Sequence, residues 1–484
     1  MRIARHMYVL ASLWLASTAW AQMPFSLDTT FRTLITREYV NSLAVLEDGK
    51  VLLSGQIRFP GSFNNLGSAR LLPNGQRDPS FGDFTGGGKL TAWSGGFYVG
   101  VGQSVKRLLP TGYNDPSFIG MNTGPYFNSL QGGDYYVYPE GRLLISGKHI
   151  LDDTARGFVG DYNLIWFSNQ GYLDTTRIHR KGNGSVYFFQ ELPDGKFICG
   201  GTCSQFESIP VDRIFRVSAA GIPDTTFQSD VYTGWSYTYV PLTDGRVYVG
   251  GNFRRNADPL DTLRLVRFMP DGSLDPSFNM PHFSLGGLEN PLGPAIGKIT
   301  PYVDGKLFVM GNFQYVNGEP RRGICVIDST GTLTELFDEC GVGVFNYQGQ
   351  TNASLRGILP YGDDHWLIWG SYNGYSDGTT NDTLQRFVTR LHVGDITTGL
   401  AQQPALQWSV YPNPTSGVVA LALDALPSNA TVVVRDALGR EVLRRTIADH
   451  YTTLDLQPLS DGIYSMELFS DHERIGTQRV VVQR

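Results

Sequence analysis

Aspartate recurs at fixed positions in this 484-residue chain, and regularly placed carboxylates are candidates for acid/base chemistry. Each copy begins a short segment, Asp-Pro-Ser-Phe or Asp-Thr-Thr-Phe, that follows a glycine-containing turn. The copies begin at Asp78, Asp115, Asp224 and Asp275. Asp followed by Pro, Ser or Thr is also typical of tight turns, in which the carboxylate accepts hydrogen bonds from nearby backbone N–H groups. We therefore expect structural roles for all four.

Two pairs of adjacent carboxylates are the other candidates, because glycosidases use two carboxyl groups. They are Asp152 with Asp153 and Asp363 with Asp364. Neighbouring residues on a strand point to opposite faces, and the second pair occupies a hairpin position that is Asp-Gly elsewhere in the chain. Structural or solvated roles are expected for both pairs, and no catalytic residue is assigned.

The sequence gives few indications of a metal site or of reactive cysteines. Cys199, Cys203, Cys325 and Cys340 could form disulfides, with three pairings open, while their spacing disfavours zinc. The histidines are scattered, which argues against a histidine-rich metal centre. Residues 373–383 offer oxygen atoms for calcium but lack the EF-hand spacing. Serine-hydrolase and zinc-protease motifs are absent from the sequence, and we predict neither a metal nor a cofactor.

The first 21 residues have the features of a signal peptide. Two arginines precede a short apolar run, and Ala19-Trp20-Ala21 provides the small-x-small pattern that signal peptidase cleaves. We expect cleavage near Ala21. No other apolar run is long enough for a transmembrane helix. A net charge of -6 provides no basic field, so nucleic acid is not an expected partner.

The aspartate segments belong to a repeat within residues 22–395. A second element, an acidic or glycine turn followed by an apolar run and glycine, occurs seven times, as in Thr-Asp-Gly-Arg-Val-Tyr-Val-Gly-Gly at residues 243–251. Residues 235–278 predict four antiparallel strands joined by Asp-Gly turns. Small sheets repeated in this way cover one another's faces. The predicted fold is all-β, a seven-bladed β-propeller with four-stranded blades.

The two ends of the repeat region complement each other. Residues 387–395 match a third strand with no fourth strand after it. Residues 24–31, Pro-Phe-Ser-Leu-Asp-Thr-Thr-Phe, match a fourth strand with no third strand before it. We expect the N-terminal segment to complete the last blade and close the ring, which removes two open sheet edges.

The repeat resembles the bacterial delta-60 repeat, which combines a glycine-containing apolar strand, a Gly-x-Leu-Asp-x-Ser-Phe turn and a loop like residues 311–318. The resemblance covers roughly residues 24–395 and is uneven: Arg177 replaces the phenylalanine of one copy, and residues 330–337 lack the aspartate. It implies a propeller-like fold and no particular chemistry.

A linker at residues 396–407 precedes a second β domain at residues 408–484, whose short strands favour a small immunoglobulin-like sandwich. Its segments YPNPTSG, DALGREV, LDLQPLSDGIY and QRVVVQR resemble, in order, the type A C-terminal sorting domain of the type IX secretion system of Bacteroidetes-type bacteria. The resemblance implies that the type IX machinery is a partner and exports the chain. The motif residues are Tyr411, Pro412, Asn413, Pro414, Gly439, Gly462, Tyr464, Val480 and Val481.

Ligand-binding residues are expected on one face of the propeller. Length variation is concentrated in residues 56–69, 148–163, 252–262, 312–322 and 371–385, and loops on a rigid scaffold commonly carry recognition. Aromatic side chains in or near these loops could stack on sugars or hold a peptide, or could instead seal adjacent blades. The candidates are Phe63, Tyr162, Phe253, Phe313, Tyr315, Tyr372 and Tyr375.

These features predict a secreted or outer-membrane-surface protein that acts as a ligand-binding or adhesion module for an unidentified glycan or protein ligand. The alternative is a secreted carbohydrate-active or hydrolytic enzyme with a carboxylate site in the central funnel.

Overall fold

The chain forms two compact units in the computed structural model, Met1–Asp395 and Ile396–Arg484. The structure describes residues 24–82, 86–102, 104–121, 127–288, 290, 293–347, 350–393, 408–413, 415–423, 426–427, 429–436, 440–470 and 473–483. The expected signal peptide and linker, and the motif residues Pro414 and Gly439, lie outside these residues.

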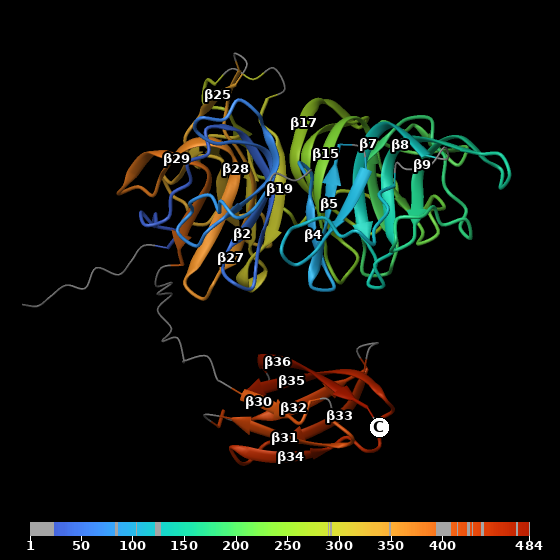
Figure 1. The fold of residues 1–484 in the computed structure, drawn as a ribbon, viewed down its shortest axis with the longest axis vertical. Coiled ribbons are helices and arrows are strands. Elements are labelled where there is room, and N and C mark those ends of the chain that lie inside the picture. The colour runs from blue at the N-terminus through green and yellow to red at the C-terminus, as the bar shows by residue number, and fades with distance from the viewer. Residues whose placement is uncertain are drawn as a thin grey trace, which may run out of the picture. The chain divides into compact units, whose positions relative to one another are not determined.

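Antiparallel sheets built from consecutive strands make up the first unit (Figure 1). In chain order the main sheets contain β1 (Arg37–Val45), β2 (Val51–Arg58) and β3 (Leu66–Leu71); β4 (Leu90–Trp93), β5 (Gly96–Val101) and β6 (Ser104–Leu108); β7 (Phe127–Val137), β8 (Leu143–Asp153) and β9 (Phe158–Phe167); β10 (Val186–Glu191), β11 (Phe197–Gly201) and β14 (Ile214–Val217); β15 (Val231–Pro241), β16 (Val247–Arg255) and β17 (Asp258–Phe268); β19 (Ile296–Pro301), β20 (Leu307–Gly311) and β23 (Ile324–Ile327); and β27 (Ser354–Tyr361), β28 (His365–Ser376) and β29 (Asn381–His392), with β24 (Gly341–Val342) beside β28.

Short elements complete this unit. They are the pairs β12 (Gln205–Phe206) with β13 (Ile209–Pro210) and β25 (Phe345–Tyr347) with β26 (Gln350–Asn352), the group β18 (Phe283–Ser284), β21 (Tyr315–Val316) and β22 (Glu319–Pro320), and the 3-10 helix η1 (Val303–Gly305). The prediction of an all-β fold is confirmed.

The middle strand of each sheet is an apolar run because neighbouring sheets cover both of its faces. All five residues of β20, Leu-Phe-Val-Met-Gly, are buried, as are those of β11. The first strands, β1, β4, β7, β10, β15, β19 and β27, all contribute residues to the wall of one cavity of about 1330 Å³. The sheets are therefore arranged around a central channel.

The predicted fourth strands are not regular strands in the described residues. Each one makes a single bridge to the third strand of its sheet before the aspartate turn begins. Regular pairing stops there because the turn bends the chain away, and in three copies its proline also lacks an N–H group for the ladder. The bridges join Leu71 with Arg77, Leu108 with Asn114, Phe167 with Leu173, Val217 with Pro223, Phe268 with Leu274 and Ile327 with Leu333.

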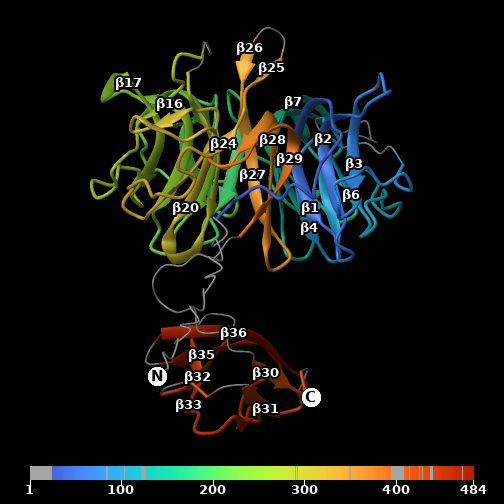
Figure 2. The same ribbon diagram turned by 90° about the vertical axis from the view of Figure 1, so that its left-hand side faces the viewer.

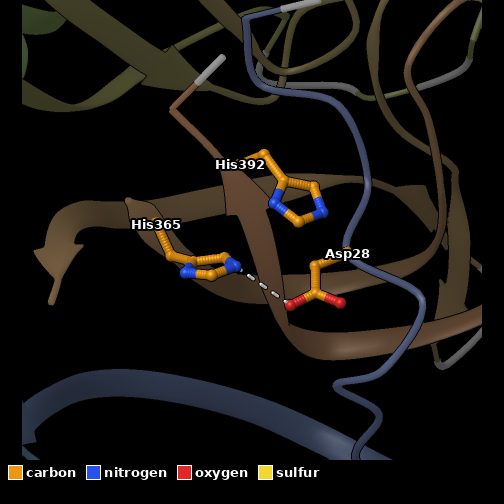
Figure 3. Close-up of side chains that lie close together, drawn as sticks. All are labelled: Asp28, His365 and His392. Atoms are coloured by element: carbon orange, nitrogen blue, oxygen red, sulfur yellow. Dashed lines mark ion pairs between the residues drawn. The ribbon is translucent and has the colours of Figure 1, made fainter. Parts of the chain in front are cut away.

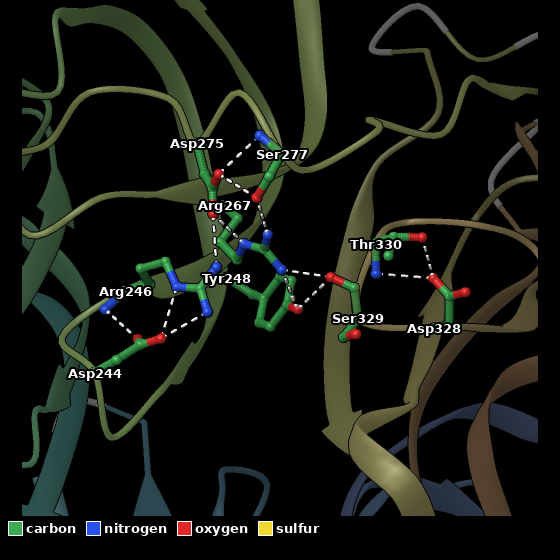
Figure 4. Close-up of polar contacts among 9 residues, drawn as sticks. All are labelled: Asp244, Arg246, Tyr248, Arg267, Asp275, Ser277, Asp328, Ser329 and Thr330. Atoms are coloured by element: carbon green, nitrogen blue, oxygen red, sulfur yellow. Dashed lines mark hydrogen bonds and ion pairs between the residues drawn. The ribbon is translucent and has the colours of Figure 1, made fainter.

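The repeated aspartates bind an arginine on the third strand of the same sheet. In the copy shown in Figure 4, Arg267 Nε donates to Asp275 Oδ2 at 2.6 Å and Arg267 Nη2 donates to Ser277 Oγ at 2.9 Å. Arg267 Nη1 donates to the carbonyl oxygen of Ser329, in the turn of the following sheet. The guanidinium also lies over the ring of Phe278, 5.1 Å from its centroid. One buried side chain thus joins a strand, its turn and the next sheet.

We call this arrangement the Arg–Asp unit. Four more copies share it, each with an arginine, an aspartate, a Ser or Thr, a Phe under the guanidinium and a carbonyl acceptor in another sheet. In that order they are Arg70, Asp78, Ser80, Phe81 and Thr111; Arg107, Asp115, Ser117, Phe118 and Asn169; Arg216, Asp224, Thr226, Phe227 and Pro270; and Arg390, Asp28, Thr30, Phe31 and Pro73.

The N-terminal segment supplies the aspartate of the last copy. It pairs with β29 through hydrogen bonds from Phe25 N to His392 O at 2.9 Å and from Asp28 N to Arg390 O at 3.1 Å. Arg390 Nη1 reaches the carbonyl oxygen of Pro73 in the first sheet at 2.8 Å. In Figure 2, β1 and β2 accordingly lie beside β28 and β29. This pairing agrees with the complementary ends seen in the sequence.

In the third sheet, the cationic and the aromatic member of the Arg–Asp unit have exchanged positions. Trp166 occupies the arginine position, eight residues before Asp174, and Arg177 occupies the phenylalanine position. The Arg177 guanidinium lies 5.9 Å from the Trp166 ring centroid, so the contact between a cation and an aromatic ring is retained with the roles reversed. Trp166 at the arginine position therefore compensates for the replacement of phenylalanine by Arg177 in this copy of the repeat.

The second unit contains two sheets that share one core. One sheet is formed by β30 (Trp408–Tyr411), β31 (Val418–Leu423) and β34 (Tyr451–Asp455), the other by β33 (Glu441–Thr446), β32 (Thr431–Arg435), β35 (Gly462–Ser470) and β36 (Glu473–Val482). Apolar residues that alternate along the strands of both sheets meet between them, including Leu421, Val432, Met466 and Val480.

Replacing Arg267 with methionine should lower the free energy of unfolding by about 3–5 kcal/mol, because it leaves a buried carboxylate without its main partner. The matched control is Arg246→Met. Arg246 also binds Asp275 Oδ2, at 2.9 Å, but its side chain is 30% exposed, so we expect a loss of about 1 kcal/mol or less. Urea unfolding of the full chain measures both, and equal losses would contradict a central role for Arg267.

The stability contributed by Asp275 should depend on pH. Burial opposes ionisation, but hydrogen bonds from Ser277, Arg246 and Arg267 outweigh it and hold the pKa of Asp275 below its ordinary value. An unfolded aspartate titrates near pH 4, so the ionised carboxylate stabilises the fold above about pH 4 and the contribution disappears as pH falls through the folded pKa. The destabilisation caused by Asp275→Asn at pH 7 should therefore shrink below pH 4. A difference that stays constant down to pH 2 would count against this.

Candidate functional site

Most of the aromatic residues predicted to bind a ligand are buried. Tyr162, Phe253, Phe313, Tyr372 and Tyr375 are each at most 5% exposed and lie in the cores between sheets. They seal adjacent sheets, and in this structure a ligand cannot reach their rings. The exposed members of the set are Phe63, which is 95% exposed, and Tyr315, at 36%.

The variable segments are largely extended hairpins. Strand β8 ends at Asp153 and its partner β9 begins at Phe158. Likewise, β28 ends at Ser376 and β29 begins at Asn381. The additional residues of these segments pair with each other and satisfy their own backbone groups.

One carboxylate of the first adjacent pair and one of the suggested calcium segment have protein partners. Asp153 is buried and pairs with Arg156 at 2.6 Å, while Asp152 points to the exposed face of β8. Asp377 is buried and accepts hydrogen bonds from the backbone N–H groups of Leu27, Thr379 and Thr380. Asp153 and Asp377 therefore have structural roles, whereas Asp152 is solvated.

The four cysteines are free and buried, so the possible disulfides are not formed in this structure. Burial raises the pKa of the Cys340 thiol to about 11 and moves those of Cys199, Cys203 and Cys325 above their ordinary values. Thiols of this kind behave as small apolar core residues.

The central channel carries more positive than negative charge. Its described lining residues include the cations Lys89, Lys298 and Arg356, and Asp134 is the carboxylate among them. Lys89 pairs with Asp134 at 2.8 Å. The other two cations form no ion pair within the described part of the chain. The pair of carboxylates expected of a glycosidase is therefore not provided by the described lining.

The side chains of Lys298 and Arg356 are exposed within the channel, and the surrounding channel wall partly desolvates them. Burial, reinforced by the like charge of Lys89, lowers the pKa of Lys298, while Asp134 opposes the shift. Burial also lowers the pKa of Arg356, whose Nη1 donates to Asn41 Oδ1 at 2.7 Å and whose guanidinium lies 4.7 Å from the centroid of the Tyr39 ring.

Half-buried aromatic rings accompany these cations in the channel wall. Tyr39, Phe188 and Tyr237 all line the channel, and the last two pack edge to face with centroids 5.6 Å apart. These residues were not predicted from the sequence. The lysine and arginine residues on the first strands could have indicated the channel wall. They lie, however, in hairpins whose other residues have the pattern of ordinary structural strands.

The two ends of the predicted sorting motif meet in the second unit. Asn413 Nδ2 donates to the carbonyl oxygen of Arg479 at 2.7 Å, and its Oδ1 accepts from the N–H of Val481 at 2.9 Å. Val480 is buried in the core, and the Tyr464 hydroxyl donates to the carbonyl oxygen of Ser460 at 2.8 Å. Tyr411 and Pro412 are exposed, and Gly462 begins β35.

Replacing Asn413 with alanine should loosen β36 at Val481, because the asparagine side chain acts as a strand partner for that residue. Hydrogen exchange at the Val481 amide should become faster, while exchange in β32 stays unchanged. Arg440→Ala is the control, since the Arg440 side chain is 72% exposed and pairs with Asp436 away from β36. Unchanged exchange at Val481 would show that Asn413 does not hold this strand.

Two family models match the chain. The Secretion system C-terminal sorting domain matches residues 409–483. The Domain of unknown function (DUF5122) beta-propeller matches residues 46–81, 242–278 and 304–333, and two of these segments end at the phenylalanine of an Arg–Asp unit. No curated protein matches the chain. Within the described residues, no helix has the length and apolar character needed to cross a membrane.

Solved structures resemble the chain at low identity. The extracellular domain assigned to a hybrid two-component system of B. thetaiotaomicron is 12% identical over 92% of this chain and 56% of its own, with a TM-score of 0.37. PorZ, a surface component of the type IX secretion system of Porphyromonas gingivalis, is 13% identical over 90% and 64%, with a TM-score of 0.33. A gluconolactonase of Xanthomonas campestris is 13% identical over 77% and 99%, with a TM-score of 0.34.

The chain thus spans less than two thirds of the first two solved structures, and these similarities carry no inference about its activity. The repeated Arg–Asp units, the sheets around a channel and the two family matches agree on one description. The chain is a β-propeller protein that carries a type IX secretion C-terminal sorting domain.

Proposed function

We propose that the chain is a secreted or cell-surface protein that binds an anionic glycan in the central channel of a seven-bladed propeller. The observation that carries this proposal is the pair of channel cations, Lys298 and Arg356, without a carboxylate partner among the described residues. Carboxylate or sulfate groups on a ligand would supply the missing negative charge.

The shape and lining of the channel favour a sugar as the carrier of that charge. Half-buried rings of Tyr39, Phe188 and Tyr237 line the same channel as the cations, and sugars stack on such flat apolar faces. A cavity of about 1330 Å³ has room for several sugar residues.

The proposed architecture has seven blades, one for each first strand that lines the channel, and is closed by residues 24–31. Support for closure comes from Arg390, which binds Asp28 of the N-terminal segment and the carbonyl oxygen of Pro73 in the first sheet. The second unit, with two sheets around one core, is proposed to be an immunoglobulin-like sandwich.

The proposed location is outside the cell. A signal peptide at residues 1–21, cleaved near Ala21, would start export, and the sorting domain at residues 408–484 would carry the propeller at residues 22–395 through the type IX machinery. After export the propeller is either released or kept on the outer-membrane surface.

A glycan array that contains neutral, uronate-bearing and sulfated oligosaccharides tests the proposal on the chain from residue 22 to 484. We expect saturable binding of anionic members that weakens with added salt, because screening reduces charge attraction. Lys298→Met and Arg356→Met should each weaken binding by about tenfold or more, since hydrogen bonds to charged groups contribute about 1.5–3 kcal/mol.

The control is Lys306→Met, which removes a lysine beside exposed Asp304 in the turn before β20, away from the channel lining. Its affinity should equal that of the unmodified chain. Binding of neutral glycans alone, or binding that ignores both channel substitutions, would refute the proposed site.

A further inference from the structure

Two histidines and an aspartate from distant parts of the sequence meet where the N-terminal segment pairs with β29 (Figure 3). His365 Nε2 lies 3.3 Å from Asp28 Oδ2, and the His365 and His392 rings have centroids 4.8 Å apart. One nitrogen of each histidine and one oxygen of Asp28 all lie within 4.8 Å of one another. In the described part of the chain, this is the group of three such side chains close enough to share a metal ion.

The histidines replace residues that the other Arg–Asp units use differently. After the hairpin turn of two other sheets, Lys196 and Arg246 bind the aspartate of the unit, whereas the last sheet has His365 there. Two residues after the unit's arginine the last sheet has His392. The corresponding residues elsewhere are Leu72, Leu109, Ser218 and Met269. Both histidines that depart from the repeat lie beside the carboxylate of Asp28. The structural role of the Arg–Asp unit does not require two histidines there.

The orientation of His365 suits a metal ligand. Its Nδ1 lies 2.6 Å from Asp364 Oδ1, so the Nδ1 proton is held by a carboxylate and Nε2 faces Asp28. Metal-binding histidines usually donate their other ring N–H to a carboxylate or a carbonyl in this way.

We propose that Asp28 Oδ2, His365 Nε2 and a ring nitrogen of His392 bind a zinc ion or another borderline divalent transition-metal ion. Neutral imidazoles with one carboxylate are a common ligand set for such ions, and three protein ligands leave one position for water. Ligand atoms of a tetrahedral zinc site lie about 3.3 Å apart, given bonds of about 2.0–2.1 Å. The side chains therefore need to move by about 1 Å.

The metal would replace the direct contact between His365 and Asp28, while Arg390 Nε keeps its hydrogen bond to Asp28 at 2.7 Å. Because Asp28 lies in the N-terminal segment and the histidines lie in β28 and β29, the ion joins the two ends of the propeller. Metal binding should therefore stabilise the pairing of residues 24–31 with the last sheet.

Isothermal titration of zinc chloride into the EDTA-treated chain from residue 22 to 484 tests the site. We expect saturable binding of about one ion per chain and a rise in the thermal midpoint of the propeller that EDTA reverses. The absence of saturable binding would overturn the proposal.

Substitutions assign the site to these residues. His365→Gln and His392→Gln leave the pair of Asp28 and Arg390 intact, so each variant should fold and lose this zinc binding. Asp364→Asn keeps all three ligands and should weaken binding by about 10–100-fold, as expected for a residue that orients a ligand. His282→Gln, at an exposed histidine elsewhere, should bind like the unmodified chain. Binding that persists unchanged in the His365 and His392 variants would overturn the assignment.

Zinc K-edge absorption of the loaded, unmodified chain gives a second test that does not depend on the folding of variants. The proposal requires two imidazole ligands with oxygen in the remaining positions. Thiolate ligands, or a shell of oxygen atoms without imidazole, would show that zinc binds elsewhere.

Discussion

Burial of a guanidinium between sheets is the constraint on which the propeller depends. A buried arginine is stable when its donors are satisfied, and in each Arg–Asp unit they reach three different segments. Arg267 holds the turn through Asp275 and Ser277 and holds the next sheet through the carbonyl oxygen of Ser329 (Figure 4). Because the acceptor belongs to the following sheet, each of the five units fixes one sheet relative to the next. The repeated aspartate segment and the arginine eight residues before the aspartate meet this requirement.

This constraint separates structural positions from positions that are free to vary. The units hold the turns and the contacts between sheets, so the first strands can carry side chains into the channel without loss of packing. Lys298 and Arg356 are placed in this way. Departures from the unit are then informative. The exchange of Trp166 and Arg177 preserves the contact and needs no function, whereas the histidines beside Asp28 add groups that the packing does not use.

In the second unit, too, one polar side chain joins distant segments of the chain. The two ends of the sorting motif lie 60 or more residues apart in the sequence, yet the amide of Asn413 serves as a strand partner for β36. The conformation of the last strand is therefore tied to the first turn of the domain. Motif residues that look like separate signals in the sequence form one structural element.

The sequence by itself determined the features that depend on local chemistry. Turn residues, apolar strands and motif order predicted the all-β fold, the structural aspartates and the sorting domain, but the arginine eight residues before Asp78 or Asp275 was not recognised as the partner of the aspartate. Tertiary structure alone decided which aromatic residues are buried, that the cysteines are free, and that Asp28 meets His365 and His392. Contacts of this kind join residues hundreds of positions apart, and their geometry follows from how the sheets pack rather than from any local pattern.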